Sequence, residues 1–271
     1  MVSYLPVCLD EALNIRVSTG AVPYAGGTDL MIDANPDVGY LFLHKVPEMC
    51  GITDDGRYIR IGASVTFTET AKSPLCPAIL REAILQIAAP AIRNLGTIGG
   101  NIGNGSPKAD SALIFFVTDS KLRLMSTRGE RIIPIKEFYL GRNKLTLEPD
   151  ELIVEVLMPK HDVSRYYYRK VGAREALAIS RISFAGLMAE RDGRIINCAV
   201  SIGAISDVIV RQDDIDAMLI GKTIEEAKTL KAAYLDAYDT AIVPIRGRVS
   251  AKYRKDVCMN LLRDFLASMG L

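Results

Sequence analysis

Two glycine-rich segments are the parts of this sequence whose residue types and spacing point to ligand chemistry. The first reads Tyr24-Ala-Gly-Gly-Thr-Asp-Leu30 and follows a strand-like Val22-Pro23 pair, so Gly26 and Gly27 stand where the backbone must turn. Glycine permits positive φ and close approach of a ligand, and successive N–H groups in such a turn form an anion-binding nest. The Thr28 hydroxyl would add a donor. A tight turn between a strand and a helix accounts for the same residues, so this segment alone does not decide between the two.

The second segment, residues 93–110, contains five glycines within ten residues: Gly96, Gly99, Gly100, Gly103 and Gly105. Ordering so many glycines costs conformational entropy, and a ligand that the backbone nearly touches is one reason to have them. The segment matches neither the GxxxxGK[ST] loop nor the GxGxxG turn of a βαβ unit. Two separated glycine turns with many backbone donors suit a diphosphate that is held from both sides.

Asp110 ends the second segment and has two competing interpretations. Its carboxylate could accept hydrogen bonds from sugar or polyol hydroxyls. Alternatively, it caps the apolar segment 112–117, which the sequence leaves as either a helix or a strand. Residue type and position do not separate these roles.

The overall composition is that of a globular protein whose main partner is not a polyanion. The 271 residues include 33 Lys+Arg and 32 Asp+Glu, which gives a formal net charge of +1, and 49% are hydrophobic. This balance lacks the basic excess typical of proteins that bind nucleic acid or anionic membranes. The length suggests about two domains, with room for a cofactor cleft between them.

Cysteine usage and hydropathy favour a cytoplasmic protein without a metal site of its own. The five cysteines show no CxxC pair and no Cys/His cluster at metal-ligand spacing: Cys8, Cys50, Cys76, Cys198 and Cys258. Asp10 and Glu11 interrupt the N-terminal segment before the apolar region of a signal peptide could form. The longest obvious apolar run, residues 112–117, is far shorter than the ~20 residues of a membrane span. We therefore expect reduced thiols, no membrane segment and a cytoplasmic location.

Short apolar runs and turn residues predict a small α/β layer in the first part of the chain. Strands are expected at residues 22–24, 40–43, 58–61, 121–125 and 152–157, with a hairpin turn at 54–56. Apolar positions at helical spacing predict a helix between Pro77 and Pro90. Its buried face would carry Ile79, Leu80, Ala83, Ile84 and Ile87.

After a boundary near residues 159–165, the pattern predicts an α+β part, a small sheet covered by helices. Asp192-Gly193 predicts a hairpin between strands at 182–189 and 194–204. Capping signals at Thr223, with Glu226, and at Ser250 predict two helices. Their buried positions would be Ala227, Leu230, Ala233 and Tyr234 in the first, and Val257, Leu261 and Phe265 in the second.

Three motifs together carry a family resemblance: Ala25-Gly-Gly-Thr-Asp-Leu30, Arg93-Asn-Leu-Gly-Thr-Ile-Gly-Gly-Asn101 and Ser106-Pro-Lys-Ala-Asp-Ser111. In this order and spacing they resemble the FAD-binding medium subunits of molybdenum hydroxylases. That family includes xanthine dehydrogenase flavoprotein subunits and the carbon monoxide dehydrogenase medium subunit. The resemblance continues through residues 169–172, 176–179 and 246–254, and so covers nearly the whole chain.

The resemblance implies an α+β protein with an FAD-binding fold of the vanillyl-alcohol-oxidase (PCMH) type. The FAD-binding domain would span residues 1–162, with an N-terminal lobe of about residues 1–55 and a central lobe of about residues 56–162. A C-terminal α/β domain like that of the carbon monoxide dehydrogenase flavoprotein would span residues 163–271. The flavin would lie in the cleft between them.

Motif match also implies a set of cofactor contacts. Backbone amides of two segments would cradle the FAD diphosphate and neighbouring groups: Tyr24, Ala25, Gly26, Gly27, Thr28, Asp29, Leu30 and Met31, and Thr97, Ile98, Gly99, Gly100 and Asn101. Asp110 would bind flavin-chain hydroxyls, and Ile87 and Ile153 would make apolar contacts. Lys170 would lie near the flavin end, where its charge would stabilise the anionic reduced ring.

Without the resemblance, three of these residues have ordinary interpretations. Ile87 and Ile153 would be core residues, and Lys170 would be a solvated charge on a strand. The sequence also departs from the family pattern, since Gly103 and Gly105 stand where relatives commonly have alanine or another small residue. Neither glycine segment contains histidine or cysteine, so we expect FAD to be bound non-covalently.

The implied function is that of an FAD-containing electron-transfer subunit, an oxidoreductase without catalytic side chains or metal ligands of its own. It would pass electrons between the clusters of a small [2Fe-2S] subunit and an external acceptor such as NAD. A large molybdopterin subunit would oxidise the organic substrate. Two alternatives stay open: a self-sufficient flavin oxidoreductase of the same fold, and a scaffold subunit that has lost FAD.

Overall fold

The computed structural model describes residues 2–271, which form two compact units built from interleaved segments. Within these residues, the first unit runs to Cys76 and adds Ile87–Ser106 and Asp119–Lys160. The second unit comprises Pro77–Gln86, Pro107–Thr118 and His161–Leu271. Two short segments from the first half of the chain therefore fold with the C-terminal part. The domain boundary expected after residue 162 stays a prediction.

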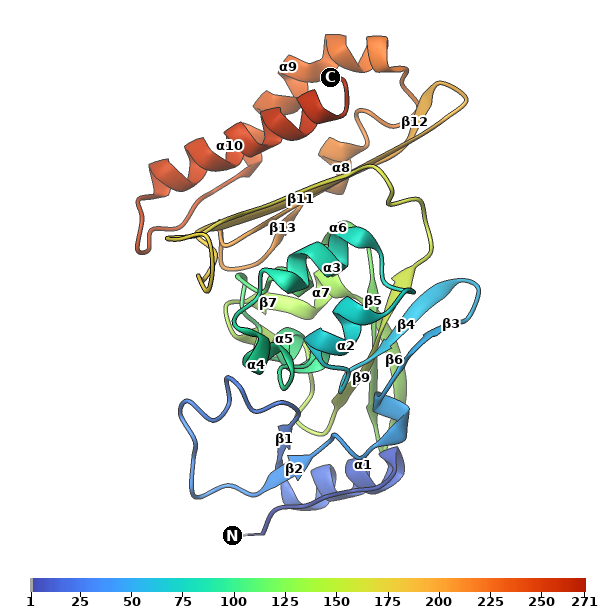
Figure 1. Cartoon of the computed structure of the whole chain (residues 1–271), viewed down its shortest axis with the longest axis vertical. Coiled ribbons are helices and arrows are strands. Elements are labelled where there is room, and N and C mark those ends of the chain that lie inside the picture. The colour runs from blue at the N-terminus through green and yellow to red at the C-terminus, as the bar shows by residue number, and fades with distance from the viewer. Residues whose placement is uncertain (1) are drawn as a thin grey trace. The chain divides into compact units, whose positions relative to one another are not determined.

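The first unit contains a five-stranded antiparallel sheet in the order β3-β4-β9-β5-β6 (Figure 1). Its strands are β3 (Ile52–Asp54), β4 (Tyr58–Gly62), β5 (Lys121–Ser126), β6 (Gly129–Pro134) and β9 (Leu152–Pro159). The central strand β9 is buried along almost its whole length, because side chains on both of its faces are covered. The strands predicted at 58–61, 121–125 and 152–157 are confirmed.

Short elements complete this unit. The helices are α1 (Leu9–Thr19), η1 (Pro47–Met49), α2 (Phe67–Lys72), α4 (Pro90–Arg93), α5 (Ile98–Gly103) and α7 (Ile135–Phe138). The remaining strands form two pairs, β1 (Val22–Tyr24) with β2 (Tyr40–Phe42), and β7 (Tyr139–Gly141) with β8 (Lys144–Leu145). The pair β1–β2 is parallel, and the chain leaves β1 directly into the first glycine segment.

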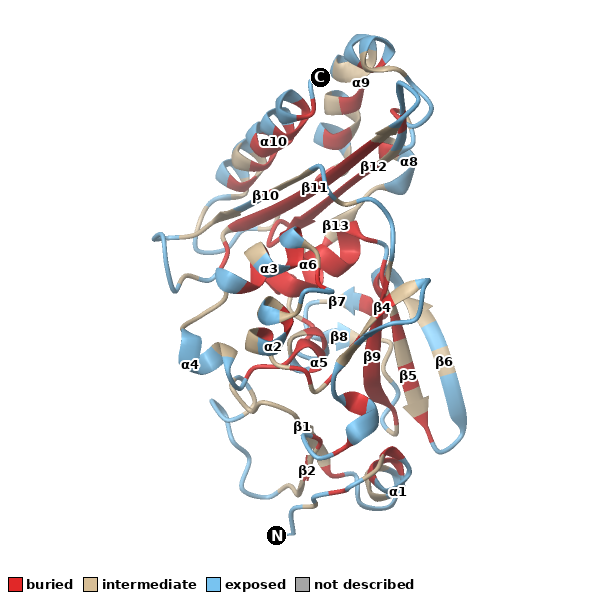
Figure 2. Ribbon diagram, turned by 45° about the vertical axis from the view of Figure 1, so that its right-hand side comes forward, coloured by how far each residue is buried: buried red, intermediate tan, exposed pale blue. Residues whose placement is uncertain are grey.

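The second unit has a four-stranded antiparallel sheet in the order β10-β11-β12-β13. Its strands are β10 (Tyr166–Val171), β11 (Ile182–Arg191), β12 (Arg194–Gly203) and β13 (Val210–Arg211), and its helices are α3 (Ala78–Leu85), α6 (Asp110–Val117), α8 (Asp213–Asp216), α9 (Ile224–Ala241) and α10 (Ala251–Ser268). Figures 1 and 2 show α9 and α10 over one face of this sheet and α3 and α6 over the other. The covering of both faces explains why eight successive residues of β11 are buried.

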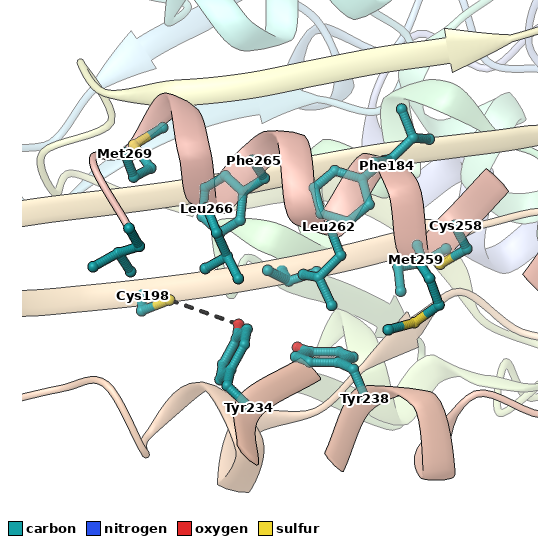
Figure 3. Packing of buried hydrophobic residues seen from close by; sticks show 14 of the residues in the cluster. Phe184, Cys198, Tyr234, Tyr238, Cys258, Met259, Leu262, Phe265, Leu266 and Met269 are labelled. Carbon is teal, nitrogen blue, oxygen red and sulfur yellow. Dashed lines mark hydrogen bonds between the residues drawn. The ribbon is translucent and has the colours of Figure 1, made fainter. Parts of the chain in front are cut away.

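The core of the second unit lies between the sheet and the two long helices (Figure 3). Phe265 and Leu266 of α10 pack against β11 and β12, and Tyr234 and Tyr238 of α9 approach the same sheet. The ring centroids of Phe184 and Phe265 are 5.9 Å apart. The predicted arrangement of a small sheet covered by helices is confirmed.

Local signals fixed the ends of the C-terminal elements. Asp192 and Gly193 have φ of 52° and 72°, the left-handed conformation that a two-residue hairpin turn requires. The Thr223–Glu226 capping box forms, and the Ser250 side chain accepts a hydrogen bond from the Tyr253 N–H. The prediction for Ala233 is wrong, since this residue is exposed.

Two predictions about helices need correction. The helix expected to continue toward Pro90 ends at Leu85, and Ile87 lies beyond it, half-buried. The chain turns at Ala88, whose φ is 43°, and Pro90 then begins α4, where its missing N–H costs nothing. The apolar segment 112–117 belongs to α6, so the strand interpretation is wrong.

Candidate cofactor site

The first glycine segment turns sharply after β1 at two positions that favour glycine. Gly27 has φ of +66°, and a Cβ there would lie 2.1 Å from the Tyr24 hydroxyl oxygen. A Cβ on Gly26 would lie 1.9 Å from the carbonyl oxygen of Leu95. Gly27 is therefore required by its backbone conformation, and Gly26 by its close packing against backbone atoms.

The backbone of this segment carries unused hydrogen-bond donors. The Met31 N–H donates to the Gly27 carbonyl oxygen at 3.0 Å, which closes the turn. Across the described chain, no acceptor pairs with the N–H groups of residues 25–30. These residues are half-buried except Asp29, which is exposed. A run of unpaired, partly buried N–H groups at a turn is the arrangement that binds an anion.

The second glycine segment is held differently, because most of its N–H groups already have acceptors. Ile98 and Gly99 donate to the carbonyls of Val65 and Ala63 at 2.9 and 2.8 Å. At the start of α5, Thr97 Oγ1 accepts from the Gly100 N–H at 3.0 Å, and the Thr97 carbonyl accepts from Asn101. Residues 97–101 thus form a fixed helix start, and most of the free donors are on the first segment.

The two glycine segments lie against each other in the first unit although they are far apart in the sequence. Gly26 packs on the backbone of Leu95 and Gly96. A Cβ on Gly100 would lie 3.9 Å from that of Ala25. The fold therefore brings together the two segments that were expected to hold one ligand from both sides.

The apolar candidates occupy different positions in the same unit. Ile153 lies on β9, is 8% exposed, and places its Cδ1 atom 3.6 Å from the position of a Cβ on Gly103. Ile87 is half-buried, and its carbonyl oxygen accepts from Arg93 Nη1 at 2.8 Å. Arg93 also donates to the Ala88 carbonyl, so it closes the turn there, a role that its sequence position did not indicate.

The family departures at two glycines have different consequences. At Gly103, an added Cβ would make only an ordinary contact with Ile153, so alanine fits. Gly105 has φ of +66°, and its Cβ would lie 3.0 Å from the Asn143 Cα, so alanine would be strained. Gly105 is thus required by the local backbone conformation, and Gly103 is not.

Asp110 and Lys170 form a buried ion pair in the second unit. Lys170 Nζ donates to Asp110 Oδ2 at 2.7 Å and to the Gln86 carbonyl at 2.8 Å, and Ser180 Oγ donates to Asp110 Oδ1 at 2.6 Å. The Lys170 and Asp110 side chains are only 9% and 6% exposed. Burial raises the pKa of Asp110 above its ordinary value, while the charge of Lys170 and the two hydrogen bonds act in the opposite direction.

This pair corrects two of the ordinary interpretations. Lys170 is not a solvated strand charge, because its ammonium group is enclosed. Asp110 is not the cap of α6, since Ala109 holds that position and Asp110 lies in the first turn, where a carboxylate favours the helix dipole. The sequence did not indicate that the two residues would bind each other, nor that Ser180 and Gln86 would complete the cluster.

Residues 2–271 contain neither a metal-binding cluster nor a membrane-spanning helix. Among these residues, no three His, Cys, Asp or Glu side chains gather as a metal site would require. None of the described helices is both long and apolar enough to cross a membrane.

Comparison with known proteins connects this geometry to a family. A family model described as "FAD binding domain in molybdopterin dehydrogenase" matches residues 1–161, and one described as "CO dehydrogenase flavoprotein C-terminal domain" matches residues 166–269. The chain is 35% identical to the xanthine dehydrogenase FAD-binding subunit of Escherichia coli O157:H7, over 75% of this chain and 73% of that one. It is 31% identical to the nicotinate dehydrogenase FAD-subunit of Eubacterium barkeri, over 98% and 95% of the two chains.

Solved structures agree with the fold. A chain of the carbon monoxide dehydrogenase from Hydrogenophaga pseudoflava superposes with a TM-score of 0.89 and 25% identity, over 98% of this chain and 96% of that one. A chain of quinoline 2-oxidoreductase from Pseudomonas putida 86 superposes with a TM-score of 0.87 over 100% of this chain and 98% of that one. Its sequence identity is 21%, so this similarity supports the fold alone. The expected fold class is confirmed. The chain belongs to the family of FAD-binding subunits of the molybdenum hydroxylases.

Proposed function

We propose that this subunit binds FAD non-covalently at the paired glycine segments and passes electrons between [2Fe-2S] clusters of a partner subunit and an external acceptor such as NAD. One observation carries the cofactor part of this proposal. The turn at residues 25–30 presents unpaired N–H groups and packs directly on the second glycine segment. Related proteins that are named FAD subunits of dehydrogenases support the redox part.

The residues present fit a diphosphate group. Unpaired N–H groups supply donors without adding a formal charge, and glycine leaves room for phosphate oxygens to reach them. The packing of Gly26 on the Leu95 and Gly96 backbone and the Met31–Gly27 hydrogen bond hold the turn in one conformation. A fixed set of donors binds an anion with little reorganisation cost.

Each part of the chain has a defined task in this mechanism. Bound FAD supplies the redox chemistry, since it accepts single electrons and releases them as a pair. The free N–H groups of residues 25–30 would bind the diphosphate end, residues 97–101 would support that turn, and Ile87 and Ile153 would exclude water from the cofactor. Asp110 would accept hydrogen bonds from flavin-chain hydroxyls. Lys170, paired with Asp110, would bring a counter-charge rather than a free positive charge.

The partners in the proposal are a small [2Fe-2S] subunit and a large molybdopterin subunit. Relatives of this chain are named as subunits of nicotinate, xanthine and carbon monoxide dehydrogenases, so the substrate differs between complexes that share this type of subunit. We infer that the choice of organic substrate is made by the large subunit and that this chain serves the acceptor side. We also place the complex in the cytoplasm.

Reconstitution of the complex tests the redox role. The chain would be produced with and without its two partner subunits, its flavin content measured by absorbance, and electron transfer to NAD followed under anaerobic conditions. We expect flavin in the complex and NAD reduction that depends on FAD. Turnover of a small substrate by the isolated chain would favour a self-sufficient oxidoreductase. A complete complex without flavin would favour a scaffold.

A further inference from the structure

The connection between α9 and α10 leads into a basic segment at the start of α10, within the second unit (Figure 1). Residues 240–255 contain five basic side chains and no acidic one: Arg246, Arg248, Lys252, Arg254 and Lys255. The two lysines have carboxylate partners, at 2.6 Å from Asp256 and at 3.5 Å from Asp239. The chain as a whole has a formal net charge of +1, so the excess carried by the arginines is local.

Arg254 is buried near the start of α10 without a carboxylate to balance its charge. The residue is 3% exposed, and its Nη1 atom donates to the carbonyl oxygens of Ala204 and, at 3.3 Å, of Arg181. Its Nε atom has no partner among the described residues. Burial lowers the pKa of Arg254, and the nearby charge of Arg181 lowers it further. Buried charges are ordinarily paired, so this guanidinium group lacks a counter-charge.

A thin layer of chain separates this buried charge from solvent. Gly247 lies directly on Arg254, since a Cβ at this glycine would be 2.7 Å from Arg254 Nη2. Gly247 is itself exposed. Arg181 adds a second guanidinium group, whose Nη1 atom is buried and unpaired. The connection between the helices therefore covers two positive charges with little protein in between.

The outer side of this layer carries more positive charge and no anion. Arg246 and Arg248, on either side of Gly247, are exposed, and their side chains make no hydrogen bond or ion pair with any of residues 2–271. Asp207 lies on the loop that hydrogen-bonds to this connection, but it forms no ion pair with either arginine. The positive end of the α10 dipole lies at the same place. These charges favour an anion that comes from outside the chain.

The residue types on this surface fit carboxylate groups of a protein. A guanidinium group binds a carboxylate through two parallel hydrogen bonds. Val243 and Tyr253, on the same segment, are 73% and 42% exposed, and tyrosine and arginine are enriched at the energetic centres of protein interfaces. A nucleic acid would require a longer basic stripe. The rest of α9 and α10 instead carries acidic residues: Asp236, Asp239, Asp256 and Asp264.

We propose that residues 243–254, with Arg181 behind them, form a docking surface for an acidic segment of a partner subunit. This inference rests on the assembly part of the proposed function. Carboxylates of the partner bind Arg246 and Arg248 at the surface, without entering the buried layer. The charges of Arg181 and Arg254 strengthen this attraction, because little water lies between them and the surface. The partner thereby supplies the counter-charge that the chain lacks.

The test compares two double variants that each remove two exposed arginines. Arg246→Gln/Arg248→Gln changes the proposed surface, and Arg191→Gln/Arg263→Gln changes the same net charge elsewhere in the second unit. Each chain, saturated with FAD, would be titrated with the purified partner subunits at about 0.05 and 0.5 M salt, because salt screens attraction between exposed charges. We expect the first variant to bind about 5- to 30-fold more weakly at low salt, with little difference at high salt. The control should match the wild type, and flavin content and thermal unfolding should be unchanged in both.

Chemical cross-linking gives a second, independent readout. Arg248→Lys places a primary amine on the proposed surface, which a carbodiimide joins to a carboxylate in direct contact. We expect this lysine to be linked to an aspartate or glutamate of a partner subunit, identified by mass spectrometry. Arg263→Lys is the matched control and should give no such product. Absence of a link from Arg248→Lys in the assembled complex overturns the inference.

Each other outcome of the titrations overturns a defined statement. Equal affinity and salt dependence of R246Q/R248Q and the wild type overturns the inference, and NAD reduction by the assembled complex then leaves the proposed function standing. Equal weakening of the control overturns the assignment to this surface in favour of a general charge effect. Binding of an oligonucleotide that R246Q/R248Q abolishes, with partner affinity unchanged, overturns it in favour of nucleic acid. No binding of the wild-type chain to any partner subunit overturns both the inference and the proposed function.

Discussion

Replacing Gly26 by alanine tests whether the paired glycine segments form the FAD site. The added Cβ would lie 1.9 Å from the Leu95 carbonyl oxygen and 2.6 Å from its carbonyl carbon. An ordinary non-bonded separation is about 3.5 Å, so the two backbones must move apart by roughly 1.6 Å. Neither contact atom belongs to a flexible side chain, and the strain of such overpacking is about 1–3 kcal/mol. This strain destabilises the conformation that binds FAD, so we expect the FAD affinity to decrease by roughly 5- to 150-fold.

The assay is a fluorescence titration of flavin-free protein with FAD, accompanied by thermal unfolding. Gly103→Ala is the matched control, because its Cβ would meet only Ile153 Cδ1, at 3.6 Å. Gly103 lies within α5, where alanine is favoured over glycine by about 0.5–1 kcal/mol. We expect this control to be slightly more stable and to bind FAD as the wild type does. A folded Gly26→Ala protein with wild-type FAD affinity would refute the reasoning.

Three further predictions concern side chains. Lys170→Met leaves the Asp110 carboxylate buried without its counter-charge, so the free energy of unfolding measured in urea should fall by about 3–5 kcal/mol. The double variant Lys170→Met/Asp110→Asn should regain much of this stability. If the losses in free energy of unfolding from the two substitutions simply add, the pairing is contradicted. Glu151 receives two hydrogen bonds from Arg131, which lower the pKa of its carboxyl, so this pair stabilises the fold above pH ~4.3 and the stabilisation is lost as pH falls through the lowered pKa. In Glu151→Gln, the free energy of unfolding in urea should change less between neutral and acidic pH than in the wild type. An unchanged pH dependence of this free energy would contradict the role assigned to the Arg131–Glu151 pair. Thr97→Ala removes the side-chain cap of α5, so the free energy of unfolding measured in urea should fall by about 1 kcal/mol. Thr97→Ser keeps a capping hydroxyl and should unfold with the wild-type free energy.

Features set by neighbouring residues could be predicted from the sequence. The Asp192-Gly193 turn requires two residues with positive φ, and few residue pairs other than Asn-Gly, Asp-Gly or Gly-Gly adopt that conformation readily. The capping box at Thr223 and Glu226 is likewise local, since its two hydrogen bonds join residues three positions apart. The alternating residues 121–125 predict a strand, and the structure has β5 there with one buried face.

Features set by distant residues could not be predicted in this way. The eight residues of α6 are all buried, which indicates that the helix is surrounded but not by which elements. It packs on β11 and β12, and Ser201 of β12 donates to the Leu113 carbonyl at 2.9 Å. Nothing in the local pattern of α3 or α6 assigns them to the C-terminal sheet. The expected length of α3 is too great because the apolar spacing continues to Ile87, beyond the helix end at Leu85.

The glycine segments of the first unit and the Asp110–Lys170 pair of the second unit differ in predictability because they use different chemistry. In the first unit the donors are backbone N–H groups. The sequence must therefore place glycine, which has no side chain, beside them. Gly26 and Gly27 therefore mark that part directly. In the second unit the groups are charged and polar side chains, and the charge that Lys170 offers depends on its partner. Paired with Asp110, it is a neutralised hydrogen-bond donor rather than the free positive charge that its position suggested. A lysine on a strand has the same sequence pattern in both cases, so only the fold separates them.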